Sequence, residues 1–344
     1  MVAIPALHLV ERTFPRARRI LLTNIRAQVK APAAFAILDG SELVHDFIDY
    51  PLATRSLKSL IRVWWKILRF RPQVVVYLMT KRGQRSLERD QWFFRVCGVW
   101  RIVGLPVGNL AYNQCDPSRQ IWESEAARLL RCMLPLGSAD ADDLSLWDLR
   151  LTAAEEARAR EALARLGRQR FIACGPGTKM QAKDWGQENW WKLLTRLGDE
   201  FSDYGLVLVG AGEDAEAAQR AATGWRGPVL NLCGVLTPRE TAAVLQHAEL
   251  FLGPDSGPMH LAAAYGVPCA IVFAARDLAG RWYPAGKGHR IVYHAVECRH
   301  CGLEVCIENA KKCLTSVTVD EMFAAAVEAW KNGHRARDGV ADRA

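Results

Sequence analysis

Hydrophobic residues in the second half of the chain form short continuous runs that alternate with segments of helical periodicity. The apolar runs cover residues 170–177, 204–212, 228–234, 249–255 and 269–275. The segments with apolar residues at helical spacing are 187–201, 213–222, 237–248 and 258–266. Short buried strands that alternate with helices in this way predict an α/β fold with a doubly wound parallel sheet.

The first half has a less regular pattern. Residues 18–25 and 73–79 have the composition of strands, 56–72 that of a helix, and 91–104 that of a helix followed by a short strand. A capped helix over 152–167 joins the two halves, and a last helix covers 318–333. This organisation predicts a shortened, divergent N-terminal domain over 1–166 and a C-terminal domain over 167–333. The tail, 334–344, has few apolar residues and is predicted to be disordered.

Composition adds limits to this picture. The chain has 344 residues, of which 50% are hydrophobic and 24% are charged, values typical of soluble globular proteins. No apolar run approaches the roughly 18 residues that a membrane-spanning helix requires. The first residues lack the charged and then apolar layout of a signal peptide. The expected location is therefore the cytoplasm.

Charge is distributed unevenly. Residues 1–135 contain 21 Lys and Arg against 10 Asp and Glu, whereas the remainder contains 24 against 27. An anionic partner of the first half, such as a phosphorylated glycolipid, a membrane surface or a nucleic acid, is one explanation. A solvated basic surface is the other, and charge alone favours it. No recognisable nucleic-acid motif accompanies the charge, so no nucleic-acid partner is expected.

Three polar, glycine-containing motifs follow predicted strands of the second half: "GPGTKMQAKDW" (175–185), "GAGED" (210–214) and "GPDSGPMH" (253–260). Ligands of parallel sheets bind beyond the carboxyl ends of the strands. Glycines allow a ligand to approach the backbone, and helix N-termini attract phosphate. The polar residues of these motifs are Thr178, Lys179, Lys183, Glu213, Asp255, Ser256 and His260. Together they predict a site for a nucleotide diphosphate, with Glu213 accepting hydrogen bonds from a ribose.

Two of these residues also have an ordinary structural explanation. A lone lysine such as Lys183 is more often a surface residue, and a lone histidine such as His260 more often a core residue. Three loops of matching chemistry at one sheet edge favour a shared site over those explanations.

The three motifs and the segments between them resemble the donor-binding half of glycosyltransferase family 9, the lipopolysaccharide heptosyltransferases and their relatives. The resemblance covers roughly residues 170–330. It implies the GT-B architecture, two Rossmann-like domains facing a cleft. It also implies transfer of a heptose from ADP-heptose to a lipid-linked, anionic glycolipid acceptor, with inversion and without a catalytic metal. Peripheral contact with the inner membrane is implied as well.

The resemblance assigns a role to each donor-site residue. Thr178 and Lys183 would hold the diphosphate, and Glu213 the nucleoside ribose. Asp255, Ser256 and Gly257 would bind the sugar and phosphate, and His260 would lie near the phosphate.

The first half departs from the family pattern, in which a Gly-Asp pair after the first strand supplies the general base. Val29 and Lys30 occupy the corresponding positions, and lysine is a poor base unless burial depresses its pKa strongly. Three explanations stay open. Another group acts as base, the nearest in sequence being Asp39, His45, Asp46 and Asp49. Alternatively, the chain binds a nucleotide sugar without turning it over. In the third explanation, Lys30 binds an acidic acceptor while another group accepts the proton.

Four of the ten cysteines lie close together, in "CRHCGLEVCIENAKKC". Cys298, Cys301, Cys306 and Cys313 have a compact spacing that predicts a structural zinc or iron site, with His300 as a spare ligand. A disulfide or free thiols are the alternatives. In either case the segment 298–313 is expected to form a knuckle between the last strand and the final helix.

Residues 57–71 combine five basic residues with tryptophans. A basic helix with aromatic residues is typical of a helix that lies on a bilayer surface. The spacing of Leu60, Val63, Trp64, Ile67 and Leu68 instead indicates a helix that packs into the core of the first domain, and periodicity favours this second interpretation.

Overall fold

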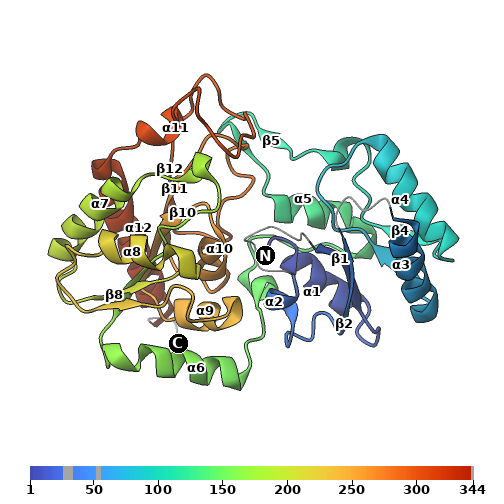
Figure 1. Cartoon of the computed structure of the whole chain (residues 1–344), viewed down its shortest axis with the longest axis horizontal. Helices are drawn as coiled ribbons and strands as arrows, with labels where there is room; N and C mark the ends of the chain where they lie inside the picture. The colour runs from blue at the N-terminus through green and yellow to red at the C-terminus, as the bar shows by residue number, and fades with distance from the viewer. Residues whose placement is uncertain (26–33, 52–55, 342–344) are drawn as a thin grey trace. The chain divides into compact units, whose positions relative to one another are not determined.

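The computed structural model describes residues 1–25, 34–51 and 56–341. The chain divides into two compact units, Val2–Arg150 and Leu151–Ala344, the latter with Met1 (Figure 1). The division falls after Arg150, whereas the sequence predicted a boundary near Leu166. The reason is that helix α6 (Ala153–Leu163) belongs to the second unit, where Glu155 forms a hydrogen-bonded ion pair with Arg239 of helix α9 (Pro238–Leu245).

The second unit is built on a six-stranded sheet in which every pair of neighbours is parallel. Its strands are β7 Phe171–Cys174, β8 Gly205–Leu208, β9 Val229–Asn231, β10 Leu250–Pro254, β11 Cys269–Phe273 and β12 Arg290–Tyr293. Their spatial order is β12-β11-β10-β7-β8-β9. Strands β7 to β11 confirm the five strands that the sequence predicts. β12 is an edge strand, only partly buried, that the apolar pattern did not reveal.

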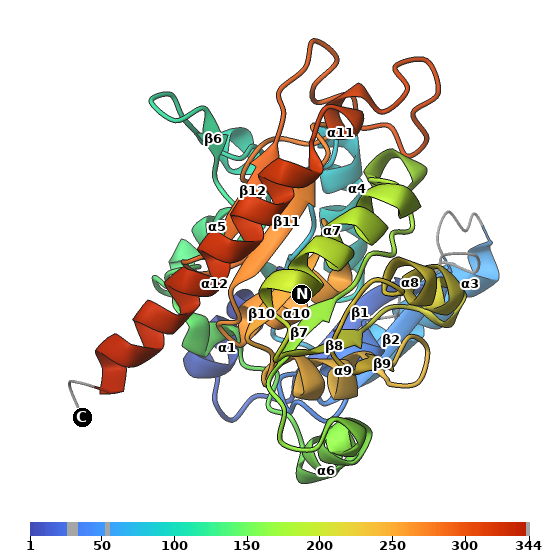
Figure 2. The same ribbon diagram turned by 90° about the vertical axis from the view of Figure 1, so that its left-hand side faces the viewer.

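Helices cover both faces of this sheet (Figure 2). The helices α7 (Gln187–Glu200), α8 (Ala215–Ala221) and α12 (Val319–Ala341) pack on one face. Helices α9 and α10 (Gly257–Ala264) lie on the other face, and the short α11 (Lys312–Thr315) precedes α12. The core between α7 and the sheet contains Trp190 and Leu193, both almost completely buried. The arrangement is the doubly wound one that alternating strands and helices predict.

The predicted capping boxes set the starts of two helices. Thr237 and Glu240 exchange hydrogen bonds at the start of α9, and Thr318 and Glu321 do so at the start of α12. Helix α12 then continues to Ala341, where the sequence predicted a disordered tail. The tail is rich in Ala and Arg, which have high helix propensity and so extend a helix that is already nucleated.

The first unit contains smaller sheets. Its helices are α1 Ile4–Thr13, α2 Phe35–Leu38, α3 Leu57–Phe70, α4 Gln84–Val96 and α5 Glu125–Cys132. Its strands are β1 Ile20–Ile25, β2 Asp46–Pro51, β3 Val74–Val76, β4 Arg101–Val103, β5 Cys115–Asp116 and β6 Ile121–Trp122. In the described part of the chain, β1 pairs with β2 and β3 with β4, both in parallel, and β5 and β6 form an antiparallel hairpin. The four parallel strands thus form two pairs in place of one continuous sheet.

A buried ion pair fixes α5 within this unit. Glu125 and Arg128 have fully buried side chains, with 2.6 Å between a guanidinium nitrogen and a carboxylate oxygen. Arg128 also donates to the carbonyl oxygens of Met79 and Leu110, at 3.0 and 3.1 Å. One side chain therefore ties α5 to the segments that follow β3 and β4. Among the described residues, no helix combines the length and apolar character needed to cross a bilayer.

Candidate functional site

The three polar motifs lie at one edge of the second unit's sheet. Strands β10, β7 and β8 are direct neighbours, and each is followed at its carboxyl end by one motif. Because all three strands are parallel, their carboxyl ends meet at the same edge, where ligands of such sheets bind. The prediction that the motifs form one site depends on this strand order, which the sequence alone did not specify.

Glycines allow the loops at this edge to approach each other closely. A Cβ added to Gly177 would overlap the carboxylate group of Asp214. A Cβ on Gly253 would lie 3.0 Å from the carbonyl oxygen of Gly175. Asp214 itself accepts a hydrogen bond of 2.9 Å from the backbone amide of Ala211. A side chain at position 177 would therefore displace the Asp214 carboxylate in the loop after β8.

Replacing Gly177 with alanine is expected to displace Asp214 and shift both loops. We expect the free energy of unfolding to fall by about 1–3 kcal/mol, as for other overpacked sites, and affinity for a nucleoside diphosphate, the ligand class that the motifs predict, to fall at least about tenfold. Urea unfolding and calorimetry measure the two effects. Gly83→Ala is the matched control, because a Cβ at Gly83 meets no atom within 4 Å. Unchanged affinity for a nucleoside diphosphate in Gly177→Ala would contradict the predicted role of this loop.

Lys183 and Asp255 form an ion pair between the loops after β7 and β10. The Lys183 ammonium donates a hydrogen bond to the Asp255 carboxylate, and only 15% and 9% of the two side chains are exposed. Burial raises the pKa of Asp255, and the positive charge of Lys183 opposes that rise. The pair places one cation and one anion side by side at the sheet edge, each able to take a new partner when a ligand enters.

Ser256 supplies a polar atom without a partner. Its hydroxyl oxygen is buried and makes no hydrogen bond, although Ser256 is the N-cap residue of α10, a position where serine usually caps the helix itself. Gly257, the first residue of α10, is exposed. A buried hydroxyl left unpaired costs about 1–3 kcal/mol, and a ligand at the start of α10 would remove that cost.

Thr178, Lys179 and Glu213 are further polar residues of the three motifs. Thr178 accepts a hydrogen bond of 3.4 Å from the amide of Met180 through its hydroxyl oxygen. Lys179 and Glu213 are exposed. The structure thus brings the motif residues to one sheet edge, with Lys183, Asp255 and Ser256 sheltered and Lys179 and Glu213 at the surface.

His260 is partly buried on the first turns of α10. Desolvation by the surrounding atoms lowers the pKa of His260 to about 3, and nearby positive charges, including that of Lys183, act in the same direction. The imidazole is therefore neutral near pH 7. In that form one ring nitrogen donates and the other accepts.

This lowered pKa makes stability depend on pH. The folded protein holds His260 neutral, whereas the unfolded chain protonates it below its ordinary value of 6.5. Its contribution is therefore present above pH 6.5 and is lost as the pH falls toward 3. Between pH 6.5 and 5, the wild type should lose up to about 2 kcal/mol more stability than His260→Gln, at about 1.4 kcal/mol per pH unit.

Urea unfolding at several pH values tests this expectation. Asp255, whose pKa is raised, titrates in both proteins and cancels in the comparison. Parallel stability curves for the two proteins would show that His260 does not titrate as the structure implies.

Sequence reasoning missed a charged loop after β11. Arg276 and Asp277 form an ion pair of 2.7 Å, and Arg281 lies 3.8 Å from Asp277. The charge of Asp277 raises the pKa of Asp255, and the charge of Arg276 lowers it. Because β11 is the neighbour of β10, its loop reaches the same edge. The sequence signal that could have revealed this loop is the Arg-Asp pair directly after the apolar run of residues 269–275.

The cysteine-rich segment, residues 298–313, connects two of the loops at the sheet edge through hydrogen bonds. The amide of Cys306 donates to the Gln181 side-chain oxygen at 2.8 Å, and Ala182 donates to the Glu304 carbonyl at 3.1 Å. On the other side, Arg276 donates to the carbonyl oxygen of Leu303 at 2.6 Å. These bonds hold the loop that carries Lys183 against the loop that follows β11.

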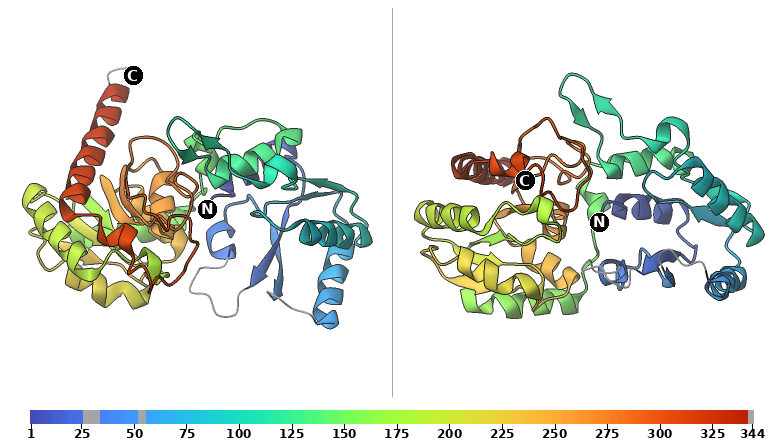
Figure 3. Two further views of the ribbon diagram at one scale, coloured as in Figure 1. Left: turned by 90° about the horizontal axis from the view of Figure 1, so that it is seen from above. Right: turned by 45° about the horizontal axis from the view of Figure 1, so that its top comes forward.

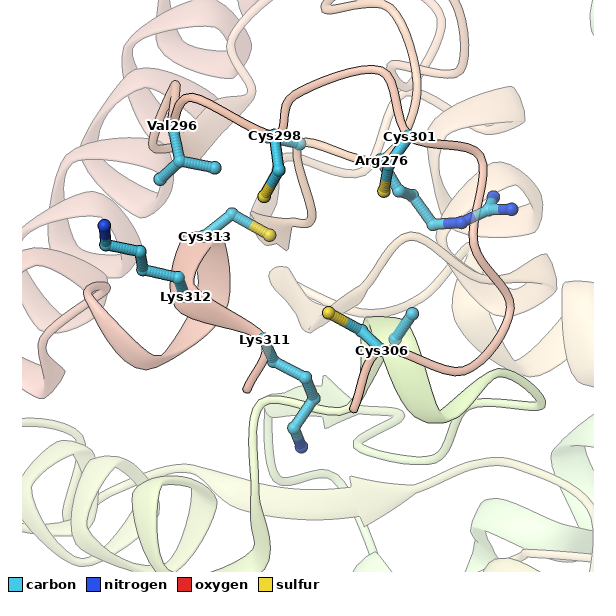
Figure 4. A pocket seen from close by; sticks show the side chains of 10 residues that line it. Arg276, Val296, Cys298, Cys301, Cys306, Lys311, Lys312 and Cys313 are labelled. Carbon is cyan, nitrogen blue, oxygen red and sulfur yellow. The ribbon is translucent and has the colours of Figure 1, made fainter. Parts of the chain in front are cut away.

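The four cysteines line one small pocket with Ala182 and Arg276, and their sulfur atoms lie around a common space (Figure 4). All four are free thiols, and burial raises the pKa of Cys313. Within the described residues, no group of three or more His, Cys, Asp or Glu is arranged to hold a metal ion. The structure therefore gives no support to the predicted zinc or iron site, because compact spacing in sequence did not produce a ligand set of suitable geometry.

The candidate bases in the first unit do not converge on one place. His45 and Asp46 lie at the amino end of β2, where His45 accepts a hydrogen bond from the amide of Arg19 and Asp46 pairs with Arg18 at 3.4 Å. Asp49 is exposed within β2, and Asp39 follows α2. Ligands approach the carboxyl ends of parallel strands, so His45 and Asp46 are poorly placed. Val29 and Lys30 lie outside the described residues.

The family model described as glycosyltransferase family 9 (heptosyltransferase) matches residues 131–312, more than half of the chain. The chain belongs to glycosyltransferase family 9. The match includes all three motifs of the site and most of the cysteine-rich knuckle, so the predicted family is confirmed.

Among the relatives of this family 9 chain is lipopolysaccharide heptosyltransferase 3 of Escherichia coli K12, which is 28% identical over 154 residues, or 44% of each chain. The curated relatives it matches are thus covered over less than half of their length.

Solved structures extend the likeness to the whole fold. The family 9 glycosyltransferase of Veillonella parvula superposes with a TM-score of 0.69 at 17% identity, covering 96% of this chain and 93% of that one. The E. coli ADP-heptose heptosyltransferase II gives 0.64 at 15% identity, covering 97% and 95%. These comparisons, together with the parallel sheet of the second unit, confirm the predicted α/β fold of the GT-B class.

Proposed function

We propose that the chain is a glycosyltransferase that moves a heptose from ADP-heptose to an anionic, lipid-linked acceptor of the lipopolysaccharide type. Family membership supports sugar transfer, and the relatives named as heptosyltransferases support the donor. The observation that carries the proposal is the sheet edge at β10, β7 and β8, where Lys183, Asp255 and the unpaired Ser256 hydroxyl lie together.

In this proposal, the diphosphate of the donor lies against Lys183 and the start of α10. Lys183 exchanges the Asp255 carboxylate for a phosphate oxygen, and Ser256 and the amide of Gly257 donate to the same group. The developing charge of departing ADP is then met by fixed donors, as catalysis without a metal ion requires. Asp255, released from Lys183, accepts hydrogen bonds from sugar hydroxyls. Glu213 binds the ribose, and Thr178 and Lys179 complete the phosphate contacts.

The transfer itself is proposed to invert the anomeric centre. An acceptor hydroxyl attacks the anomeric carbon as the bond to ADP breaks, and its proton passes to a base of the protein. Acceptor and base are proposed to belong to the first unit, whose excess of positive charge suits an anionic acceptor. Asp39 and Asp49 remain the candidates in the described part of that unit. We place the protein in the cytoplasm, in peripheral contact with the inner membrane.

A second candidate function rests on a specific sequence observation. Lys30 stands where family members have the aspartate that serves as general base. Loss of a general base typically lowers the rate by about 10²–10⁴. A chain that bound ADP-heptose and never released ADP would be a nucleotide-sugar-binding or scaffold protein.

One experiment separates the two candidates. Calorimetry with ADP-heptose tests the donor site, and ADP release in the presence of lipopolysaccharide-type acceptors tests transfer. Binding together with acceptor-dependent ADP release supports the transferase. Binding without release with any acceptor supports the scaffold, and absence of binding removes both.

A further inference from the structure

Two helices of the first unit present an exposed apolar surface. Trp65 of α3 is 61% exposed, Trp92 of α4 is 65% exposed, and Trp100, just after α4, is 78% exposed. Ile61 and Val96 are exposed beside them. Contiguous exposed apolar residues of this kind usually mark an interaction site. We refer to these five residues as the tryptophan patch.

The members of the patch lie on adjoining elements. The indole nitrogen of Trp64, on α3, donates a hydrogen bond of 3.2 Å to the carbonyl oxygen of Val96, the last residue of α4. Helices α3 and α4 are neighbours on the same side of the first unit (Figure 3). Trp92 and Val96 are one helical turn apart on α4, so both project from its outer side. The patch therefore joins residues of two helices that are in direct contact, and Trp100 follows four residues after the end of α4.

Helix α3 carries a second stripe directly beside the apolar one. Leu57, Ile61 and Trp65 follow each other at intervals of four residues and form the exposed apolar stripe. The basic stripe, shifted by one residue, consists of Lys58, Arg62, Lys66 and Arg69, all exposed. The opposite side of the helix, with Val63 and Ile67, packs into the core. The helix thus shows three faces: buried, exposed apolar and basic.

This corrects the choice between two interpretations of residues 57–71. Core packing explains Val63 and Ile67, as periodicity predicted. It does not explain the exposed Ile61 and Trp65, or Leu60, which is 42% exposed. The helix packs on the domain with one face and leaves an amphipathic surface facing outward.

We propose that the tryptophan patch and the basic stripe of α3 bind the surface of a bilayer that contains anionic phospholipids. Tryptophan prefers the boundary between hydrocarbon and water, where its ring is apolar and its N–H meets polar groups. Lysine and arginine near an anionic leaflet are attracted to it, and each such residue strengthens binding by roughly fivefold. The inference deepens the proposed function and rests on it in one respect, since a lipid-linked acceptor is itself held in a bilayer.

Other occupants fit the surface less well. A second copy meeting this face by two-fold symmetry would oppose two basic stripes, and α3 contains no acidic residue to offset them. Single-stranded nucleic acid stacks on aromatic rings, but Ile61 and Val96 offer it nothing comparable. An anionic bilayer accommodates apolar, aromatic and basic side chains together.

The chain provides a matched control for the test. The sequence Trp-Trp-Lys occurs twice, as Trp64-Trp65-Lys66 on α3 and as Trp190-Trp191-Lys192 on α7. In both, the first tryptophan is the more buried, and the second is exposed, at 61% for Trp65 and 42% for Trp191. The double variants Trp65→Ser/Lys66→Glu and Trp191→Ser/Lys192→Glu therefore make the same chemical change on two different surfaces.

Co-sedimentation of the full-length protein with sucrose-loaded vesicles tests the proposal. Wild type should bind vesicles with about 30% phosphatidylglycerol at least about tenfold more tightly than pure phosphatidylcholine vesicles, and added salt should weaken that binding. Trp65→Ser/Lys66→Glu should lower the partition at least about tenfold. Trp191→Ser/Lys192→Glu should stay within about twofold of wild type. If the first variant fails to fold, Arg62→Glu/Trp100→Ser, which changes only exposed side chains, takes its place.

Several results would overturn the proposal. They are no preference for anionic vesicles, equal loss in both double variants, and no loss in the α3 variant. A wild-type dimer that the α3 variant abolishes, without vesicle binding, would assign the surface to a second copy. ADP-heptose calorimetry on the same proteins keeps the two proposals apart, because donor binding requires no vesicle. Vesicle binding without donor binding would refute only the proposed function. Donor binding without vesicle binding would refute only this inference.

Discussion

Replacing Lys183 with methionine is expected to lower kcat/KM for heptose transfer at least about 100-fold, as loss of a fixed donor to a developing anion does in other enzymes. The variant removes the cation that the proposal assigns to the departing ADP. It also leaves Asp255 buried without its partner, which favours the protonated form of that carboxyl group. Acceptor-dependent ADP release measures the rate, and calorimetry measures the affinity for ADP.

Two further variants show whether the effect is specific. Lys192→Met removes a half-exposed lysine of α7 and should leave transfer unchanged. The double variant Lys183→Met/Asp255→Asn removes the unpaired charge and should restore stability without restoring transfer. Normal ADP affinity in folded Lys183→Met would refute the assignment of Lys183 to the diphosphate.

Replacing Arg128 with methionine is expected to lower the free energy of unfolding by about 3–5 kcal/mol, because one partner of a fully buried pair is removed and Glu125 remains. The carbonyl oxygens of Met79 and Leu110 also lose a donor. Since Arg128 joins α5 to the segments after β3 and β4, the loss should affect the first unit as a whole. Urea unfolding followed by circular dichroism measures it.

An arginine with an exposed side chain provides the comparison for Arg128. Arg89 lies 2.9 Å from Asp90, but 68% of the Arg89 side chain is exposed, and Arg89→Met should cost less than about 1 kcal/mol. The double variant Glu125→Gln/Arg128→Met should recover part of the stability, because no buried charge is left unpaired. A cost for Arg128→Met as small as that for Arg89→Met would show that the pair is unimportant for folding.

Local signals predicted much of the second unit. The apolar runs of β7, β8, β10 and β11 are buried on both faces, and such strands read as continuous hydrophobic segments. The capping boxes at Thr237 and Thr318 depend on residues three positions apart, so they too can be read directly. Motifs that follow strands could be assigned to the carboxyl edge before any strand order was known.

Other features depended on neighbours far away in sequence. β12 is partly buried at the sheet edge, so its residues carry no strong apolar pattern. The assignment of α6 to the second unit depends on the pairing of Glu155 with Arg239. The exposed face of α3 could not be separated from its buried face, because both are apolar and only packing shows which one is covered.

The sequence by itself determined the family, the alternation of strand and helix, and the residue types at the proposed donor site. Each of these depends on residues that lie close together in the sequence. The tertiary structure alone decided that β10, β7 and β8 are neighbours, that Lys183 meets Asp255, and that the Ser256 hydroxyl is buried without a partner. It also decided that the four closely spaced cysteines line one small pocket without the geometry of a metal site. The physical reason is that strand order and side-chain direction arise from packing between distant segments, which no local pattern encodes.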